Sequence, residues 1–172
     1  MSRRTILTTR LKFEPITWAD CDRMAVLHAD ARVMDLLKHG VLNRQQSDAM
    51  VADYEAEWSA FGFGSWTVTE RASGSLVGYG GLRVHDGGFG IALRAAFTPE
   101  AQGNGYGPEL GHTAATYAFD VAKIDRVIAI TRRSNIPGQR SLEKFGMHRE
   151  REWTTADGRI LVLYALCNPK AG

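Results

Sequence analysis

The stretch Gln102–Glu109 has the residue types and spacing most suggestive of chemistry in this chain. Gly103, Gly105 and Gly107 stand at alternate positions, and glycine lets a backbone approach another group closely or take positive φ angles. Pro108 suits the first turn of a helix, where its missing N–H costs no hydrogen bond. The free N–H groups and the dipole of such a helix start favour an anion such as a pyrophosphate. A glycine-rich turn that only permits close packing is the alternative.

Two other phosphate-binding motifs do not fit this stretch. A Walker loop requires Gly-Lys-Ser/Thr, which the sequence does not contain. A dinucleotide fingerprint requires a glycine three residues after Gly105, where Pro108 stands instead. The loop alone therefore predicts an anion-binding turn without naming the anion.

Length and composition predict a single soluble domain over residues 1–172. With 172 residues and 44% apolar side chains, the chain can bury a substantial core. A formal net charge of +2 gives no reason to expect nucleic acid as a partner. The start, Met1–Thr5, is unlike a signal peptide, and no apolar stretch is long enough for a bilayer, so we expect a cytoplasmic protein without a membrane partner. Cys21 and Cys167 match no metal or redox spacing and are expected to be reduced, mostly buried thiols, with no metal bound.

Charge is distributed unevenly along the chain. The last 50 residues carry ten Lys or Arg against five Asp or Glu. An anionic ligand is therefore expected to meet the C-terminal part, although a solvated basic face would have the same composition.

Hydrophobic periodicity predicts the element order β-α-α-β-β-β-α-β-α-β-β, which describes one mixed sheet with helices on its faces. The three central strands form a meander and should be antiparallel. Thr17 and Asp20 form a capping motif before the first helix, and Asn43 caps the second. The expected strands are Leu11–Ile16, Ser65–Glu70, Leu76–Val84, Phe89–Phe97, Val127–Thr131, His148–Thr154 and Ile160–Leu166. The last two helices are expected over Leu110–Val121 and Gln139–Phe145.

Four segments in register resemble the GNAT acetyltransferases. Gln102-x-x-Gly105-x-Gly107 is similar to the Q/R-x-x-G-x-G/A signature of that family and lies, as there, between a strand and a helix. The segments Thr9–Pro15, Leu76–Leu82 and Asn135–Met147 resemble motifs of the RimJ/RimL-like branch. The resemblance runs from about residue 8 to residue 166. It implies an α/β (α+β) GNAT fold with a mostly antiparallel seven-stranded sheet flanked by helices.

The resemblance also implies a site for acetyl-coenzyme A. Backbone N–H groups of the glycine-rich stretch would bind the pyrophosphate, and the end of the meander near Phe97 would pair with the pantetheine arm. That strand would splay from the one near Val127–Thr131 to leave a gap for the thioester. Arg140 and Lys144 would reach phosphates, although solvated helix charges explain them equally. The coenzyme-binding residues expected on these grounds are Phe97, Thr98, Gln102, Gly103, Asn104, Gly105, Tyr106, Gly107, Pro108, Asn135, Arg140 and Lys144.

The resemblance further implies direct attack of an amine on the thioester, with no covalent enzyme intermediate. The candidates for a general base are His85 and Asp86 at the meander turn and Glu100 before the loop, and His85 is the one whose intrinsic pKa suits the task. Many GNAT enzymes place a proton-donating tyrosine seven residues after the asparagine, but Leu142 stands there, and Gly138 replaces the serine of the branch motif. Ser141 is the substitute donor, unless a water serves.

The acceptor is expected to be a primary amine on a protein N-terminus or a small molecule, and a homodimer is plausible for the family. Trp58, Phe61, Phe63 and Trp66 stand where the branch builds its acceptor pocket; those that are exposed would indicate an aromatic-lined site. A non-catalytic acyl-coenzyme A-binding module is the alternative, because the tyrosine and serine are missing. A nucleotide-binding loop is a third hypothesis.

Overall fold

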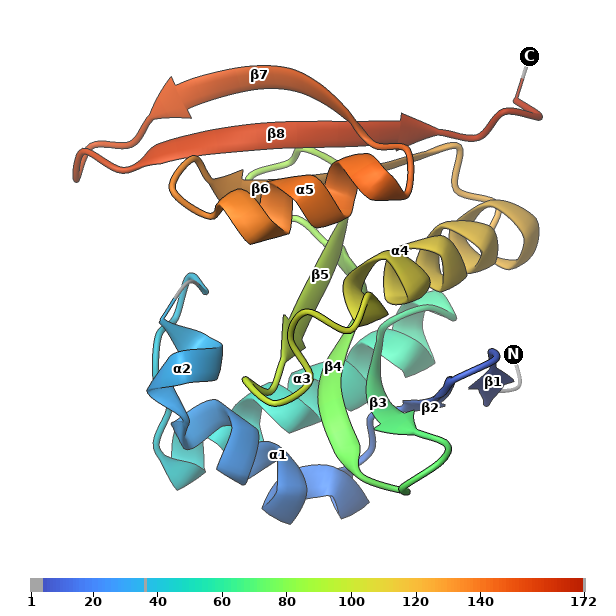
Figure 1. The fold of residues 1–172 in the computed structure, drawn as a ribbon, viewed down its shortest axis with the longest axis vertical. Coiled ribbons are helices and arrows are strands. Elements are labelled where there is room, and N and C mark those ends of the chain that lie inside the picture. The colour runs from blue at the N-terminus through green and yellow to red at the C-terminus, as the bar shows by residue number, and fades with distance from the viewer. Residues whose placement is uncertain (1–4, 36, 172) are drawn as a thin grey trace. The chain divides into compact units, whose positions relative to one another are not determined.

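The computed structural model describes residues 5–35 and 37–171 of the chain (Figure 1). Residues 1–4 and 172 fall within the domain predicted over residues 1–172, and residues 1–4 are also part of the start that is unlike a signal peptide. All of them lie outside the described residues. The chain divides into two compact units, one of residues up to 81 with 95–106, the other of residues 82–94 with 107 onward. The single-domain prediction stays a prediction.

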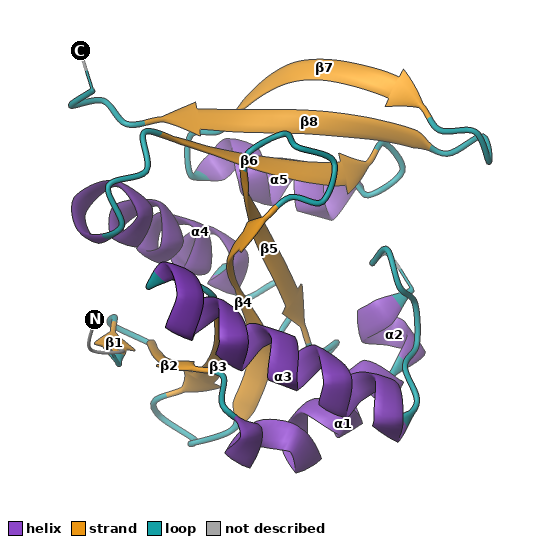
Figure 2. Cartoon of the chain, turned by 180° about the vertical axis from the view of Figure 1, so that it is seen from behind, coloured by secondary structure: helices purple, strands orange, loops and turns teal. Residues whose placement is uncertain are grey.

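Strands and helices follow the predicted order with small additions (Figures 1 and 2). The strands are β1 (Ile6–Leu7), β2 (Leu11–Pro15), β3 (Ser65–Glu70), β4 (Leu76–Val84), β5 (Ile91–Phe97), β6 (Arg126–Arg132), β7 (His148–Thr154) and β8 (Ile160–Cys167). The helices are η1 (Trp18–Asp20), α1 (Cys21–Ala29), α2 (Ala31–Met34), α3 (Arg44–Phe61), α4 (Tyr106–Thr116), the π-helical turn η2 (Tyr117–Val121) and α5 (Ile136–Lys144).

The strands hydrogen-bond in the order β1-β2-β3-β4-β5-β6-β8-β7, and β4 and β5 contribute to both units. The described sheet therefore has eight strands, not the predicted seven. The added strand β1 has two residues and pairs antiparallel with β2 at the edge, where pairing on one side is enough to hold it. β2, β3 and β4 pair antiparallel, as do β6, β8 and β7, so the mixed, mostly antiparallel α/β fold is confirmed.

In the first unit, α1 and α3 pack on the strands around one apolar cluster (Figure 2). α3 begins at the predicted Asn43 cap, whose side chain accepts the Gln46 N–H. The Gln46 side chain in turn accepts the Asn43 N–H, a reciprocal bond that was not predicted. Gly62, with φ of 72°, ends the helix in the left-handed conformation that glycine adopts without strain. The Trp58 indole then donates to the Ser65 carbonyl, which joins the end of α3 to the start of β3.

In the second unit, α4 and α5 pack together on the sheet of β6, β8 and β7. Gly111 of α4 lies so close to Phe145 that an added Cβ would approach the ring to 2.4 Å. Tyr164 of β8 points its hydroxyl at Glu143 and Gln139 of α5. The opposite sheet face holds a second apolar cluster that includes Ile128 and Leu163. The strand side chains alternate between these two faces, which matters for the site described below.

Two local expectations are wrong. The last helix begins at Ile136 rather than Gln139, because Asn135 caps it and Pro137 fits its first turn. Cys21 is buried as expected, but Cys167 is exposed, since it is the last residue of β8 and lies beyond the covered part of the sheet. Within the described residues, no helix has both the length and the apolar character needed to cross a membrane.

His28 is a fully buried titratable group in the first unit. Its Nδ1 lies 2.8 Å from the Ser47 hydroxyl, its Nε2 has no hydrogen-bond partner within the described residues, and its ring meets Tyr79 edge-on. Burial lowers the pKa of His28 from about 6.5 to about 4, because the charged ring would lose its hydration. The fold therefore holds this imidazole neutral.

The buried His28 predicts a specific loss of stability in mild acid. Since the folded-state pKa lies below the unfolded one, stability is complete above pH 6.5 and falls as the pH drops towards 4. The loss amounts to roughly 2–3 kcal/mol in the free energy of unfolding. Urea unfolding at pH 7 and pH 4.5 measures it. His28→Gln keeps a hydrogen-bonding group for Ser47 and should lose less over the same interval, since the buried imidazole is gone and the remaining titratable groups are common to both proteins. Equal losses in both proteins would contradict the assignment.

Candidate active site

The glycine-rich stretch forms a compact loop between β5 and α4. Gly103 and Gly105 have φ angles of 80° and 76°, which favour glycine, so these two residues are needed for the path of the backbone. The Gln102 side chain donates to the Phe97 carbonyl at 3.3 Å, and the Asn104 side chain donates to the Ala101 carbonyl at 2.9 Å. Both polar side chains thus close the loop on itself, and ligand binding falls to the backbone.

Arg10, at the start of β2, holds the loop from outside. Its guanidinium donates to the carbonyls of Asn104 at 2.6 Å and Gly105 at 3.2 Å. In a trans peptide the C=O and N–H point in opposite directions. Carbonyls turned towards Arg10 therefore turn the N–H groups of Gly105 and Tyr106 away from it. Across residues 5–35 and 37–171, the N–H groups of Gly103, Asn104 and Gly105 donate to no protein acceptor.

The Tyr106 side chain completes this support. Its ring lies under the Arg10 guanidinium at 4.8 Å, and its hydroxyl hydrogen-bonds Glu70 at the end of β3. Hydrogen bonds from Ser73 and Tyr106 lower the pKa of Glu70, so its carboxylate is a stable acceptor. Tyr106 is buried, which makes its side chain a structural support, while its backbone remains in the first turn of α4. No role was predicted for Arg10 or Glu70; the one available signal was the position of Arg10 inside the Thr9–Pro15 motif.

The end of β5 is held close to β4. The Thr98 N–H donates to the Val77 carbonyl at 2.9 Å. A Cβ on Gly78 would approach the Ala96 carbonyl oxygen to 2.3 Å, so the glycine of this β4 motif is required by the passing backbone. Phe97 packs near Tyr106, with ring centroids 6.4 Å apart. Phe97 and Thr98 therefore lead directly into the supported loop.

β5 and β6 pair over only a short length. They run parallel, with Ile91 opposite Val127 and Ala92 opposite Ile128, and no further pair joins them among the described residues of the second unit. β6 continues its pairing with β8 as far as Arg132. Strands that splay apart can pair only over a short length, so this short ladder is compatible with the expected splay of β5 from β6.

Asn135 is held by two neighbours. Its Oδ1 accepts the Gly138 N–H at 3.1 Å and its Nδ2 donates to the Thr131 hydroxyl at 3.0 Å. A Cβ on Gly138 would lie 2.4 Å from the Asn135 Nδ2, so glycine at this position lets the Asn135 side chain fold over the helix start. Asn135 is thus a helix cap fixed to β6, with one amide hydrogen and one lone pair remaining for a ligand.

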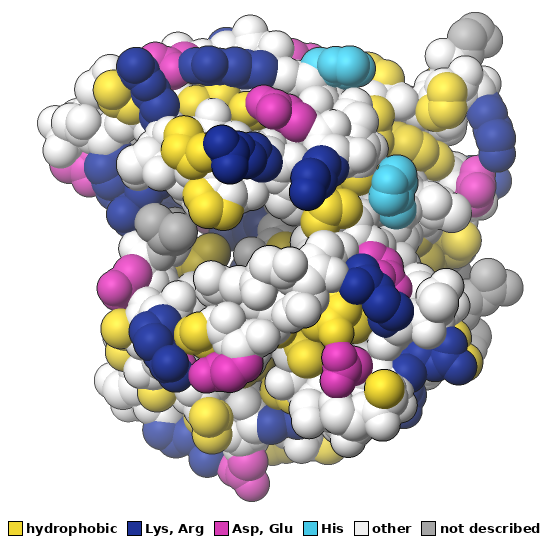
Figure 3. Space-filling view, in the orientation of Figure 1, with side chains coloured by type: hydrophobic (Ala, Val, Ile, Leu, Met, Phe, Trp, Pro, Cys, Tyr) yellow, Lys and Arg dark blue, Asp and Glu magenta, His cyan; other side chains and the backbone are white. Residues whose placement is uncertain are grey.

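The α5 candidates differ in position. The Ser141 hydroxyl lies against the first turn of α4, because a Cβ on Gly107 would meet the Ser141 oxygen at 2.4 Å. Arg140 and Lys144 are exposed, and Lys and Arg side chains gather over α5 and the β7–β8 hairpin (Figure 3). In the second unit, the structure brings Ser141 to Gly107 near Pro108.

His85 and Glu100, two of the candidate bases, lie in different surroundings. His85 follows β4 with its Nδ1 accepting the Gly87 N–H at 3.0 Å and its ring against Phe89. The Glu100 carboxyl is 73% exposed and lies 3.6 Å from Arg32. One ring nitrogen of His85 is therefore engaged by the backbone, and the Glu100 carboxyl is largely open to solvent.

The aromatic residues expected at an acceptor pocket are mostly core. Trp58, Phe63 and Trp66 are buried, and Phe61 is 52% exposed and stacks on Phe63. Of these four rings, only Phe61 could line an acceptor site.

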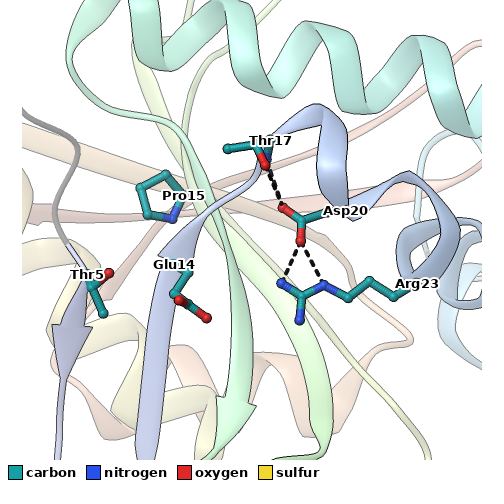
Figure 4. Close-up of a pocket in the computed structure, with 6 residues that line it drawn as sticks. All are labelled: Thr5, Glu14, Pro15, Thr17, Asp20 and Arg23. Carbon is teal, nitrogen blue, oxygen red and sulfur yellow. Dashed lines mark hydrogen bonds and ion pairs between the residues drawn. The ribbon is translucent and has the colours of Figure 1, made fainter.

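The acidic residue in a surface pocket beside η1 serves to cap the helix and is not part of a reaction site (Figure 4). Its acid, Asp20, accepts the Thr17 N–H at 2.8 Å and pairs with Arg23 at 2.5 Å, so the predicted capping motif is confirmed. Among the described residues, no three His, Cys, Asp or Glu side chains are grouped as metal ligands would be. The pocket is lined by Thr5, Glu14, Pro15, Thr17, Asp20 and Arg23.

A glycine-rich loop that runs from a strand to a helix start, with backbone N–H groups that meet no acceptor among the described residues, is compatible with an acyl-coenzyme A-dependent transferase of GNAT type. Residues 10–148 match the family described as acetyltransferase (GNAT) domain, and the chain belongs to this family. It is therefore an acyltransferase that transfers an acetyl group to an amine.

Three similar proteins illustrate the family. The chain is 26% identical over 145 residues to the uncharacterized N-acetyltransferase YnaD of Bacillus subtilis (strain 168), covering 84% of this chain and 83% of that protein. The ribosomal-protein-S5-alanine acetyltransferase of Vibrio fischeri has the same fold, with a TM-score of 0.80, 12% identity and coverage of 98% and 99%. Aminoglycoside acetyltransferase AAC(6')-Ib in complex with coenzyme A gives a TM-score of 0.76, 15% identity and coverage of 92% and 95%.

Removing the support of the loop should weaken coenzyme binding. Arg10→Gln deletes the charged donor that faces the Asn104 and Gly105 carbonyls, so the N–H groups lose their fixed orientation. We expect the dissociation constant of coenzyme A to rise about tenfold, which corresponds to about 1.4 kcal/mol. Isothermal titration calorimetry measures it.

Lys12→Gln is the matched control for Arg10→Gln, because Lys12 lies two residues further along β2 and pairs with Glu14 instead of the loop. Its coenzyme affinity should equal that of the wild type. Unchanged affinity in a folded Arg10→Gln protein would show that the loop does not depend on Arg10.

Proposed function

We propose that this enzyme transfers the acetyl group of acetyl-coenzyme A directly to a primary amine, and that an α-amine is the preferred acceptor. The observation that carries the proposal is the glycine-rich loop. Among the described residues, the N–H groups of Gly103, Asn104 and Gly105 donate to no protein acceptor, and Arg10 holds the carbonyls of Asn104 and Gly105. Converging N–H groups at a helix start suit a pyrophosphate without any lysine. A neighbour of the same fold is a complex with coenzyme A, which supports the same ligand here.

In this proposal the chain holds the coenzyme mainly through its backbone. Within Gln102–Pro108, the N–H groups of Gly103, Asn104 and Gly105 bind the pyrophosphate, and the end of β5 at Phe97 and Thr98 lies along the pantetheine. Asn135 uses its remaining amide hydrogen or lone pair, and Arg140 and Lys144 supply exposed positive charge near α5. Acetyl-coenzyme A supplies the thioester that the amine attacks.

The surroundings of the two cysteine thiols favour direct transfer over a covalent acyl-enzyme intermediate. Burial, followed by the nearby Asp48 carboxylate, raises the pKa of Cys21, so this thiol is a poor nucleophile. Cys167 is exposed at the end of β8, where it pairs with Arg126, the first residue of β6. Neither thiol is placed as a covalent intermediate would require.

The weak bases favour an α-amine acceptor. At pH 7, removing the proton from an α-amine with a pKa of about 7.7–8.0 costs about 1 kcal/mol, whereas a lysine amine near 10.4 costs about 4.6 kcal/mol. His85 and Glu100, the proposed bases, are respectively engaged by the Gly87 N–H and largely exposed, so they suit the smaller task. An N-terminal amine or a small molecule with a low-pKa amine meets that condition. The V. fischeri neighbour is named for an alanine of a ribosomal protein, which is compatible with the RimJ/RimL-like branch.

The activity is tested by following coenzyme A release from acetyl-coenzyme A with a panel of peptides, amino sugars and polyamines. The protein should carry Cys167→Ser, because the exposed thiol would react with thiol-detecting dyes. We expect peptides with free α-amines to be acetylated faster than α-blocked peptides that offer only lysine. Coenzyme binding without release on any acceptor would support the alternative, a non-catalytic acyl-coenzyme A-binding module.

Ser141 can be assigned by separating its effects on kcat and KM. Its hydroxyl lies against Gly107 in the first turn of α4, where the coenzyme is proposed to bind. We therefore expect Ser141→Ala to raise the KM for acetyl-coenzyme A about threefold to tenfold, with kcat within twofold of the wild type. Steady-state kinetics at saturating acceptor measures both. A lower kcat at unchanged KM would instead make Ser141 the proton donor to the leaving thiolate.

A further inference from the structure

Three arginines surround one pocket in the second unit. The pocket has a volume of about 490 Å³ and lies where the end of β6 meets the turn between β7 and β8. The volume is large enough for an amino-acid-sized group. The lining residues are Arg132, Arg133, Ser134, Gly158, Arg159 and Ile160.

The positive charge of this pocket is only partly balanced. Arg159 pairs with Asp157 at 2.5 Å, and Arg133 pairs at 3.2 Å with Glu152, which also binds Arg149. Arg132 has no acidic partner within the described residues. A guanidinium has five N–H donors in a planar fork, so even the paired arginines keep donors for another anion.

The pocket begins on the sheet face opposite to α5. Thr131 bonds Asn135, and Tyr164, which stands opposite Ala129, bonds Gln139 and Glu143, so these β6 and β8 side chains face the helix. Side chains alternate along a strand, so Arg132 shares the other face with Ile128 and Ile130.

The coenzyme is proposed to meet the second unit on the α5 side, at Gly107, Asn135 and Ser141. An arginine on the other face is therefore poorly placed for the same phosphates. Arg132 is also the last residue of β6, four residues beyond the last pair with β5. The arginine pocket thus lies at the end of β6, on the face of this sheet opposite to the α5 side at which the coenzyme is proposed to meet the second unit.

We propose that this pocket binds an anionic group, a carboxylate or phosphate, on the molecule that carries the acceptor amine. Arg132 and Arg159 hold that group as a fork and so select acidic acceptors, with Arg133 and Ser134 as further donors. This inference rests on the proposed function, because it assigns the acceptor side of the same reaction. It names the substrate class: primary amines on molecules that also carry a negative charge.

The test uses pairs of acceptors that differ in one charge. Two peptides with the same free N-terminal residue carry Asp or Asn next, and a second pair carries phosphoserine or serine there. For the wild type we expect kcat/KM at least tenfold higher for the charged member of a pair. The two pairs distinguish a carboxylate site from a phosphate site. Equal rates within both pairs would overturn the proposal.

Substitutions of the arginines test whether they cause the preference for charged acceptors. In Arg132→Gln and Arg159→Gln the charged-to-neutral ratio of kcat/KM should fall to within about twofold of one, mainly through KM. Arg126→Gln is the matched control, since Arg126 lies at the opposite end of β6 and pairs with Glu150. It should keep the wild-type ratio. A rise in KM for acetyl-coenzyme A, equal for both members of a pair, would instead assign the arginines to the coenzyme.

A binding measurement separates this inference from the proposed function. If no acceptor is turned over, calorimetric titration with the Asp-containing peptide still reports on the pocket. Binding that is lost in the Arg132→Gln, Arg159→Gln double variant and kept in Arg126→Gln would support the site without catalysis. Absent or unchanged binding would reject it.

Discussion

The candidate coenzyme site depends on the contact between the Arg10 guanidinium and two carbonyls of the glycine-rich loop. Glycine residues permit the positive φ angles of this loop, but they also permit many other conformations, so they cannot by themselves fix where an N–H points. Arg10 fixes the direction by holding the C=O side of two consecutive peptides. Glu70 and Tyr106 secure the same corner, with the Tyr106 ring lying under the guanidinium. Because the Arg10 cation holds the carbonyls on one side of the loop, the N–H groups on the other side are left to face an anion.

Local sequence information was sufficient for the elements and insufficient for this contact. Asn43 with Gln46, the spacing of Tyr54 and Trp58, and Gly62 define α3 from neighbouring residues, and the helix forms as expected. Arg10 and Gly105 are 95 positions apart, and no periodicity links them. The two-residue strand β1 and the four-residue helix α2 are too short to leave a periodic pattern. The start of α5 was placed three residues late, although Asn135 and Pro137 together indicate it.

The departure from the family pattern at Gly138 has a local compensation. In the branch motif a serine stands there, and in this chain a Cβ at that position would collide with the amide of Asn135. With glycine, Asn135 caps α5 and binds Thr131, so the helix start is joined to β6 by one side chain. The cost of glycine at the start of a helix is modest, because the first turn has few hydrogen bonds to lose. The missing serine is therefore better explained by the way Asn135 caps the helix than by loss of activity.

The two proposed substrate sites are built from different parts of the chain. The coenzyme side, as proposed, uses backbone groups and glycines, which tolerate changes in most neighbouring side chains as long as the path of the loop is kept. The acceptor side, as proposed, uses the side chains of Arg132, Arg133 and Arg159, which single substitutions can replace. Such a division lets the acceptor change while the coenzyme site and fold persist. It accounts for a fold shared, at 12% and 15% identity, with enzymes named for a ribosomal protein and for an aminoglycoside. The acceptor of this enzyme should accordingly be sought in the chemistry of its arginines rather than in the overall likeness to either neighbour.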